Sequence, residues 1–176
     1  MPHITLPDGI PGIVGPLTCY PNSAKHLSGL AQAVLRGPSS LTPAEREIIA
    51  AFVSSGNECY FCTHSHAAAA RHLLGDQCQL MDDILTNAAT AQVSDKLRAL
   101  LAIAAKVRRD GRLVTAEDIQ IARDAGADDQ AIHDTVLIAA MFCMYNRYVD
   151  GLATWVPKDQ GMYAEMGARL ATEGYV

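Results

Sequence analysis

Two cysteines and a histidine at short, regular spacing are the residues of this sequence best suited to chemistry. They lie in the segment 57–71, which reads NECYFCTHSHAAAAR and contains Cys59, Cys62 and His66. On a helix, with about 100° between successive residues, these three side chains fall within a stripe about 60° wide. A second histidine, His64, points away from that stripe. The spacing predicts one helical face that carries two thiols and a base.

Such a face suits thiol redox chemistry. The thiolate is the reactive form of cysteine, and we expect a helix N-terminus and a neighbouring cysteine to lower the thiol pKa. Cysteines three residues apart can close a disulfide with little backbone movement, so that one attacks an oxidised substrate and the other resolves the intermediate. His66 can hold or relay the proton. Glu58, just before the pair, is interpreted as an ordinary acid at the helix start.

The preceding helix offers a carboxylate that no local motif explains. Glu45 completes a capping box with Thr42, whereas Glu47 lies opposite the apolar side of the helix. Its own side carries small residues, which permit the close approach of a second helix: Ala50, Ala51 and Ser54. We expect Glu47 to be partly buried there, with a raised pKa that suits proton transfer.

Capping boxes, prolines and glycines predict where the helices begin and end. The segments 42–45 (TPAE) and 115–118 (TAED) are capping boxes, and Gly37-Pro38, Gly75 and Gly126 are stop signals. We expect helices over about 23–35, 42–55, 59–74, 79–91, 94–109, 115–126, 128–151 and 159–172. No strand-like alternation is long enough to compete. Residues 1–176 are therefore predicted to form one all-α domain, a bundle of seven or eight helices with the CxxC at a helix N-terminus.

The first twenty residues are predicted to be an irregular arm. They contain four prolines and three glycines, and each proline removes a backbone donor and fixes φ. The arm is still apolar, and we expect it to lie on a surface of its own subunit or of a neighbouring one.

Composition excludes several functional classes. The formal net charge is −5 and no basic run exists, which argues against nucleic-acid binding. No apolar stretch is long enough to span a membrane, and the first residues do not resemble a signal peptide. Five cysteines are an odd number, so a secreted disulfide framework is not expected. The protein is predicted to be cytoplasmic, and Cys19, Cys78 and Cys143 to be core or surface thiols.

Zinc is the main alternative for the cysteine pair. The CxxC with His64 or His66 supplies three ligands, whereas a closed structural site needs four, and no second CxxC or HxxxH exists. No nucleotide-binding glycine motif is present either. We therefore expect no metal and no organic cofactor.

Two segments of the sequence are similar to a known family. Leu41-Thr-Pro-Ala-Glu-Arg-Glu47, followed after twelve residues by Cys59-x-x-Cys62 and then His66, resembles the AhpD-like alkylhydroperoxidases of the carboxymuconolactone decarboxylase superfamily. The match is closest to the branch called peroxidase-related proteins. Residues 146–150, which place Asn146, Arg147 and Asp150, resemble that branch's Asn-Arg-x-x-Asp segment. These three residues either shape the pocket, bond across a subunit interface or form an ordinary polar face.

The resemblance implies a function and an assembly. It implies an antioxidant, thiol-dependent alkylhydroperoxide reductase in which Cys62 attacks the peroxide, Cys59 resolves the intermediate, and Glu47 and His66 form a proton relay. It also implies trimers or hexamers, and a thiol or reducing partner protein as electron donor. The chain departs from AhpD at Phe61, where AhpD has a histidine. The alternatives are a general disulfide reductase, a redox sensor, a zinc-binding module, and a lactone decarboxylase, although decarboxylase members lack the cysteine pair.

Overall fold

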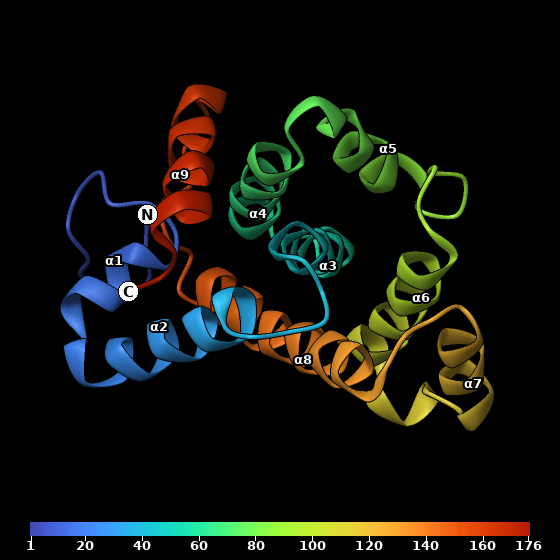
Figure 1. Ribbon diagram of the computed structural model, residues 1–176. Helices are drawn as coiled ribbons and strands as arrows, with labels where there is room; N and C mark the ends of the chain where they lie inside the picture. Colours follow the sequence, from blue (N-terminus) through green and yellow to red (C-terminus); the bar gives the residue numbers. More distant parts are fainter.

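The computed structural model describes residues 1–176, and the chain is entirely helical (Figure 1). The all-α prediction is confirmed. The α-helices are α1 (Val14–Cys19), α2 (Pro21–Arg36), α3 (Pro43–Gly56), α4 (Tyr60–Leu74), α5 (Gln79–Asn87), α6 (Asp95–Arg109), α7 (Ala116–Asp124), α8 (Asp129–Gly151) and α9 (Gln160–Glu173). Single 3₁₀ turns follow α4 at Gly75–Gln77 and α6 at Gly111–Leu113.

The helix that the sequence did not predict is α1, which lies in the arm expected to be irregular. Pro16 falls in the first turn of α1, where a missing N–H removes no helical hydrogen bond. The helix ends at Tyr20 because that residue precedes Pro21, and proline disfavours helical dihedrals in the residue before it. Prolines at these two positions therefore delimit a helix rather than prevent one.

Capping boxes fix the starts of α3 and α7, as the sequence predicts. Thr42 accepts a hydrogen bond from the Glu45 N–H at 3.2 Å, and the Glu45 carboxylate accepts one from the Thr42 N–H at 2.8 Å. Thr115 and Asp118 form the same reciprocal pair at the start of α7. Each box satisfies two of the N–H groups that a helix start leaves without partners.

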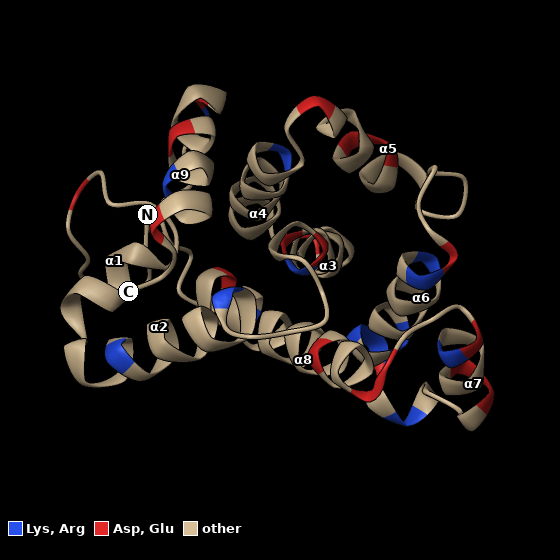
Figure 2. Ribbon diagram, in the orientation of Figure 1, with Lys and Arg blue, Asp and Glu red and all other residues tan.

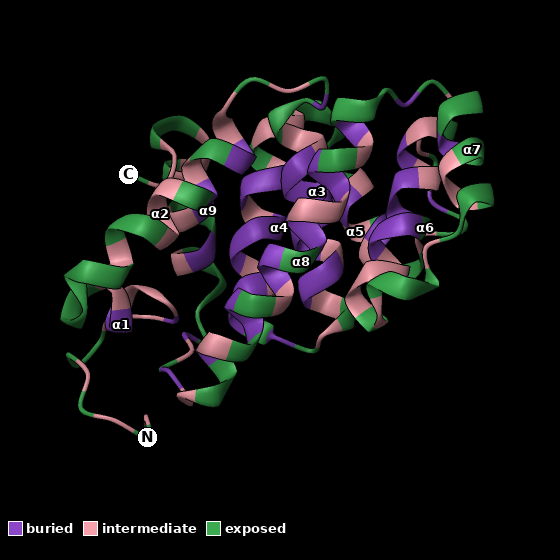
Figure 3. Cartoon of the chain, turned by 90° about the horizontal axis from the view of Figure 1, so that it is seen from below, coloured by how far each residue is buried: buried purple, intermediate pink, exposed green.

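Helix α3 is the centre of the bundle. It packs against α2, α4, α5, α6 and α8, and Figure 1 shows it nearly end-on with α4 and α8 beside it. Helix α9 covers the outer side of α4, and α7 packs on α6 at the opposite end. Both sides of α3 are buried, the apolar side and the small-residue side alike (Figure 3). A helix enclosed in this way has no solvent face on which to place its charged residues.

Two charged residues of α3, Arg46 and Glu47, are buried among other helices, and Figure 2 shows the charged positions on that helix. Arg46 donates to the carbonyl oxygens of Val34 and Gly37 at 3.1 and 2.8 Å, which satisfies the last turn of α2. Glu47, the next residue, is fully buried. No helix is both long enough and apolar enough to cross a membrane.

Candidate active site

The chain reverses between α3 and α4 in three residues. Glu58 takes a left-handed φ of 61°, and Cys59 then serves as the N-cap residue of α4. The Cys59 N–H donates to the Ser54 carbonyl oxygen at 3.1 Å, which ties the start of α4 to the end of α3. Glu58 is exposed and directly precedes this N-cap residue, so it lies beside the helix start and outside the first helical turn.

The two cysteines are buried together at the start of α4. Cys59 is 0% exposed and Cys62 is 3% exposed, and both are free thiols. A hydrogen bond to Cys59 and then burial raise the pKa of the Cys62 thiol well above its ordinary value. The sequence led us to expect a lowered pKa at this helix N-terminus. That expectation fails because burial and the neighbouring thiol oppose the helix dipole, so Cys62 is protonated at neutral pH.

Glu47 of α3 and His66 of α4 meet inside the bundle. The His66 Nδ1 atom lies 2.7 Å from Glu47 Oε2. The other carboxylate oxygen, Oε1, accepts hydrogen bonds from Arg36 Nη2 and from the Tyr175 hydroxyl, each at 2.5 Å. The structure thus joins the predicted pair and adds a residue from α2 and one from the segment after α9.

These partners reverse the predicted pKa shift of Glu47. Burial alone would raise the pKa of this carboxyl, as we expected from the sequence, but the charge and hydrogen bond of His66, the charge of Arg36 and the Tyr175 hydrogen bond outweigh it. The net effect is a lowered pKa. Glu47 is therefore a carboxylate at neutral pH, and the prediction of a raised value is wrong.

An ionised Glu47 determines which nitrogen of His66 carries a proton. A carboxylate only accepts hydrogen bonds, so the contact at Nδ1 requires the proton to be on Nδ1. The neutral ring then has a lone pair on Nε2. The Phe142 ring contacts the imidazole edge-on at 4.5 Å between centroids and limits its rotation.

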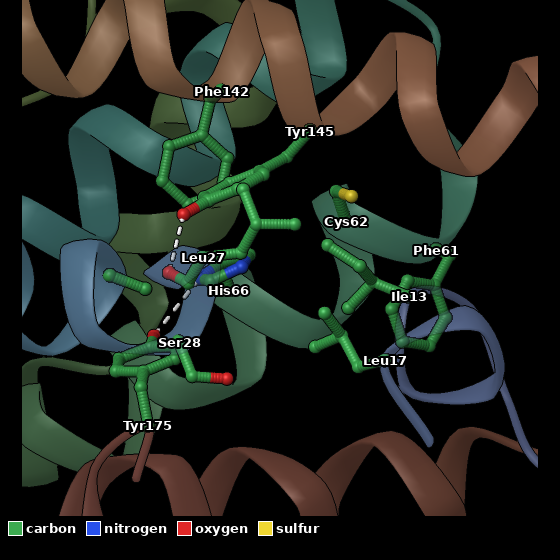
Figure 4. A pocket seen from close by; sticks show the side chains of 11 residues that line it. Ile13, Leu17, Leu27, Ser28, Phe61, Cys62, His66, Phe142, Tyr145 and Tyr175 are labelled. Carbon is green, nitrogen blue, oxygen red and sulfur yellow. Dashed lines mark hydrogen bonds between the residues drawn. The ribbon is translucent and has the colours of Figure 1, made fainter. Parts of the chain in front are cut away.

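A small apolar cavity of about 70 Å³ lies beside the thiol and the imidazole (Figure 4). Phe142 and Tyr145 of α8 border it on one side and Tyr175 on the other. Its remaining lining residues are Ile13, Leu17, Leu27, Ser28, Ala31, Phe61, Cys62 and His66. A cavity of this volume suits a small or slender apolar group adjacent to the reactive atoms.

The N-terminal arm packs against Phe61 of α4, which lines the cavity. A Cβ atom at Gly12 would lie 2.1 Å from the Phe61 ring, so only glycine permits this approach. Ile13 and Leu17 follow and border the cavity directly. The arm therefore lies on its own subunit here, which is one of the two placements that the sequence left open.

The segment that resembles the Asn-Arg-x-x-Asp motif lies behind the cysteines. Asn146 is buried, accepts from Asn57 Nδ2 at 2.9 Å, and donates to Ser54 Oγ at 3.0 Å. A hydrogen bond from Asn146 to Cys62 opposes the rise in that thiol's pKa. Arg147 and Asp150 are exposed. Asn146 thus contacts the thiol without bordering the cavity.

The remaining candidate residues lie apart from the cavity. His64 stacks on Tyr60 at 3.7 Å between ring centroids and does not border the cavity, so it points away from His66 as predicted. Cys19 and Cys78 are exposed, and Cys143 is partly buried. No three histidine, cysteine or acidic side chains gather closely enough to hold a metal ion.

Sequence reasoning missed Arg36 and Tyr175. Arg36 occupies the last position of α2, where a cation commonly serves only to favour the helix dipole. Tyr175 is separated from Glu47 by 128 positions in the sequence. Neither residue forms a motif with the CxxC, so no local signal pointed to them.

A family comparison and solved structures show which proteins the chain is similar to. The sequence matches the model of the carboxymuconolactone decarboxylase family over residues 21–106. No curated protein matches the chain significantly. An uncharacterised peroxidase-related protein from a Silicibacter species is 28% identical, with a TM-score of 0.79 and coverage of 93% of this chain and 94% of that chain.

Two further structures share the fold. An uncharacterised peroxidase-related protein from Ralstonia eutropha with an alkylhydroperoxidase AhpD core is 25% identical, with a TM-score of 0.79 and coverage of 90% and 81% of the two chains. A protein of unknown function from Agrobacterium tumefaciens, proposed to be the antioxidant defence protein AhpD, is 19% identical, with a TM-score of 0.72 and coverage of 84% and 99%. The chain is therefore similar to the carboxymuconolactone decarboxylase family over residues 21–106, and over most of its length it resembles AhpD-like, peroxidase-related proteins.

Proposed function

We propose that this protein is a thiol-dependent peroxidase that reduces organic hydroperoxides at Cys62. The observation that carries the proposal is a pair of free, buried cysteines beside an apolar cavity whose wall includes a histidine oriented by a carboxylate. The family likeness supports this reading at the level of an AhpD-like protein. The cysteine roles and the proton relay are part of the proposal.

The reaction begins with attack on the peroxide. The Cys62 thiolate attacks the terminal oxygen of the hydroperoxide, an S–O bond forms, and the O–O bond breaks with its electron pair leaving on the alkoxide. The alkoxide takes a proton and becomes the alcohol, while Cys62 becomes a sulfenic acid. Cys59 then attacks the Cys62 sulfur, an S–S bond forms, and water departs. Two equivalents of an external thiol restore the pair and become a disulfide.

The raised pKa of Cys62 makes a base necessary. Only the thiolate attacks, and the buried thiol holds its proton at neutral pH. His66 lies one turn further along the same helix and borders the same cavity, and its Nε2 can accept that proton. The imidazolium, stabilised by Glu47, can then protonate the departing alkoxide. Glu47 thus orients His66 and balances its charge, while it remains a carboxylate and neither accepts nor gives up a proton.

Thiol counting on the reduced protein tests the proposal. Cumene hydroperoxide added to the wild-type protein should consume two thiols per chain. Cys62→Ser should consume none, because the attacking sulfur is gone, and Cys59→Ser should stop at a Cys62 sulfenic acid that dimedone traps. Cys78→Ser is the matched control, since this exposed cysteine lies outside the cavity and its loss should leave the reaction unchanged. Unchanged thiols in the wild-type protein would contradict the proposal.

A general disulfide reductase would use the same two cysteines. The apolar lining of the cavity favours an organic hydroperoxide over a polar disulfide. The ratio of the two rates decides between them: reduction of cumene hydroperoxide should exceed that of oxidised glutathione under the same thiol supply. Faster turnover of the disulfide would favour the reductase.

We also propose that the chain assembles with copies of itself as a trimer or hexamer, as the family likeness implies. Large apolar side chains at Tyr20, Met144 and Trp155 are exposed on the single chain and would be covered in such an assembly. Light scattering should give a mass three or six times that of the chain, and a monomeric mass would contradict the assembly.

A further inference from the structure

The segment after α9 brings a tyrosine back to the middle of the bundle. Helix α9 ends at Glu173, and Gly174 takes a left-handed φ of 82° with a backbone position where a Cβ would lie 2.3 Å from Gln32 Oε1. The Tyr175 N–H donates to that same oxygen at 2.8 Å. Gly174 thus turns the chain, and Gln32 of α2 holds it in place.

The Tyr175 side chain then contacts each member of the buried charge cluster. Its hydroxyl donates to Glu47 Oε1 at 2.5 Å. Its ring lies parallel to the His66 ring, with 11° between the planes and 6.0 Å between centroids. The Arg36 guanidinium lies over the same ring, 5.1 Å from its centroid. Three separate contacts therefore converge on one side chain.

The two oxygens of Glu47 have different partners. Oε1 receives Arg36 and Tyr175, whereas Oε2 receives only His66. Burial by itself favours the neutral carboxyl, which can donate a hydrogen bond. A protonated Glu47 would donate to His66 Nδ1 and move the ring proton to Nε2, the nitrogen that must accept the Cys62 proton. The two hydrogen-bond donors on Oε1, Arg36 and Tyr175, stabilise the ionised carboxylate and so oppose its protonation.

We infer that Tyr175 and Arg36 are positioning residues of the redox site, which hold Oε1 of Glu47 so that the carboxylate stays ionised and keeps His66 in its base-competent form. The inference rests on the proposed function, because it assigns a purpose to the orientation of His66. Both residues act through Glu47 and His66.

Titration of the His66 ring by proton NMR tests this directly. The groups that face Glu47 are Arg36 from α2, His66 from α4 and Tyr175, with Arg46 of α3 at longer range. Tyr175→Phe removes one donor from the carboxylate, which then attracts the imidazole proton more strongly. The midpoint for the His66 ring should therefore move to higher pH by about one pH unit, the size expected for one hydrogen bond to a charged group.

Tyr163→Phe is the matched control. Tyr163 is also buried, but its hydroxyl donates to the Pro157 carbonyl oxygen at 3.1 Å and contacts neither Glu47 nor His66. This variant should leave the His66 midpoint unchanged. A Tyr175→Phe midpoint that coincides with the wild-type and Tyr163→Phe values would overturn the inference and leave Tyr175 a structural contact only.

Two more variants make the test independent of folding and of peroxidase activity. Arg36→Gln removes the other donor to Oε1 and should move the midpoint in the same direction, so it decides the matter if Tyr175→Phe unfolds. In a Glu47→Gln background, Tyr175→Phe should cause no further movement, since its effect passes through the carboxylate. The NMR titration needs no peroxide, so a protein that fails thiol counting but shows these shifts would refute the proposed function and still establish that Tyr175 and Arg36 act on His66 through Glu47.

Discussion

His66 Nδ1 and Glu47 Oε2 are 2.7 Å apart, across the contact between α4 and α3, and the carboxylate has no exposure to solvent. This distance joins the helix that carries the thiols to the helix at the centre of the bundle. We therefore expect the proposed activity and the stability to depend on the same hydrogen bond, so that substitutions here affect both.

Glu47→Gln should lower both stability and activity. The amide keeps the shape of the side chain but removes the charge opposite Arg36 and His66, which leaves a largely buried guanidinium uncompensated. We expect a loss of about 3 kcal/mol in the free energy of unfolding. The rate of peroxide reduction should fall about 100-fold as the base loses its orientation. Urea unfolding and thiol counting measure the two effects, and an unchanged unfolding midpoint would show that the ion pair is not stabilising.

Acid should destabilise the wild-type protein through the same carboxylate. The folded-state pKa of Glu47 lies below its ordinary value of 4.5. Its contribution to stability is therefore fully present above pH 4.5 and is lost as the pH falls through the lower folded-state pKa. The melting temperature should decline below pH 4.5, and it should decline less steeply in Glu47→Gln. Parallel acid profiles for the two proteins would contradict this assignment.

Gly12→Ala should disturb the cavity as well as the arm. The residue has a φ of 51°, and a Cβ there would overlap the Phe61 ring at 2.1 Å. We expect a loss of about 3 kcal/mol from backbone strain and overpacking together. The KM for the hydroperoxide should rise, because Phe61 must move out of the cavity wall.

Gly9→Ala separates strain from overlap in that experiment. Gly9 has a similar φ of 71°, but nothing lies within 4 Å of a Cβ built there. Its substitution should cost about 1 kcal/mol from strain alone and leave the KM unchanged. Equal KM values for Gly12→Ala and the wild-type protein would show that Phe61 does not limit substrate entry.

Removal of the cap of α3 should affect stability alone. Thr42→Ala deletes the side chain that accepts the Glu45 N–H, at a cost of about 1 kcal/mol. Thr115→Ala removes the equivalent cap from α7, which lies away from the cavity, and should cost about the same. Neither should change the peroxide-reduction rate of the folded protein. A selective loss of activity in Thr42→Ala would indicate that the cap also sets the position of Glu47.

The helix starts that carry a capping residue were predictable because their signals are local, whereas the helix expected over 79–91 ends earlier, at Asn87. Thr42, Thr115 and Asp128 each cap their helix through a residue three positions on, so a short stretch of sequence contains the whole interaction. The one unexpected helix, α1, depends on where Pro16 falls within a turn. Composition alone suggests that prolines prevent a helix. The position of the proline within the helical turn decides whether a helix can form.

The site was predictable in its residues and not in its electrostatics. Cys59, Cys62 and His66 share one helix, so their spacing determines that they are buried on related sides of α4. The pKa directions of Cys62 and Glu47 were both wrong, because each depends on burial and on partners from other elements. Those partners are distant in the sequence and come close only through tertiary packing, so the local sequence pattern could not predict the pKa shifts.

The enclosure of α3 has a consequence for the motions of the molecule. Its middle turns are buried under five neighbouring helices, so we expect their amide hydrogens to exchange with deuterium far more slowly than those of exposed segments. Glu47 lies on these middle turns, and we expect its position to persist through local fluctuations of the chain. Ends of the chain and exposed turns can fluctuate many times while the carboxylate that orients His66 keeps its place.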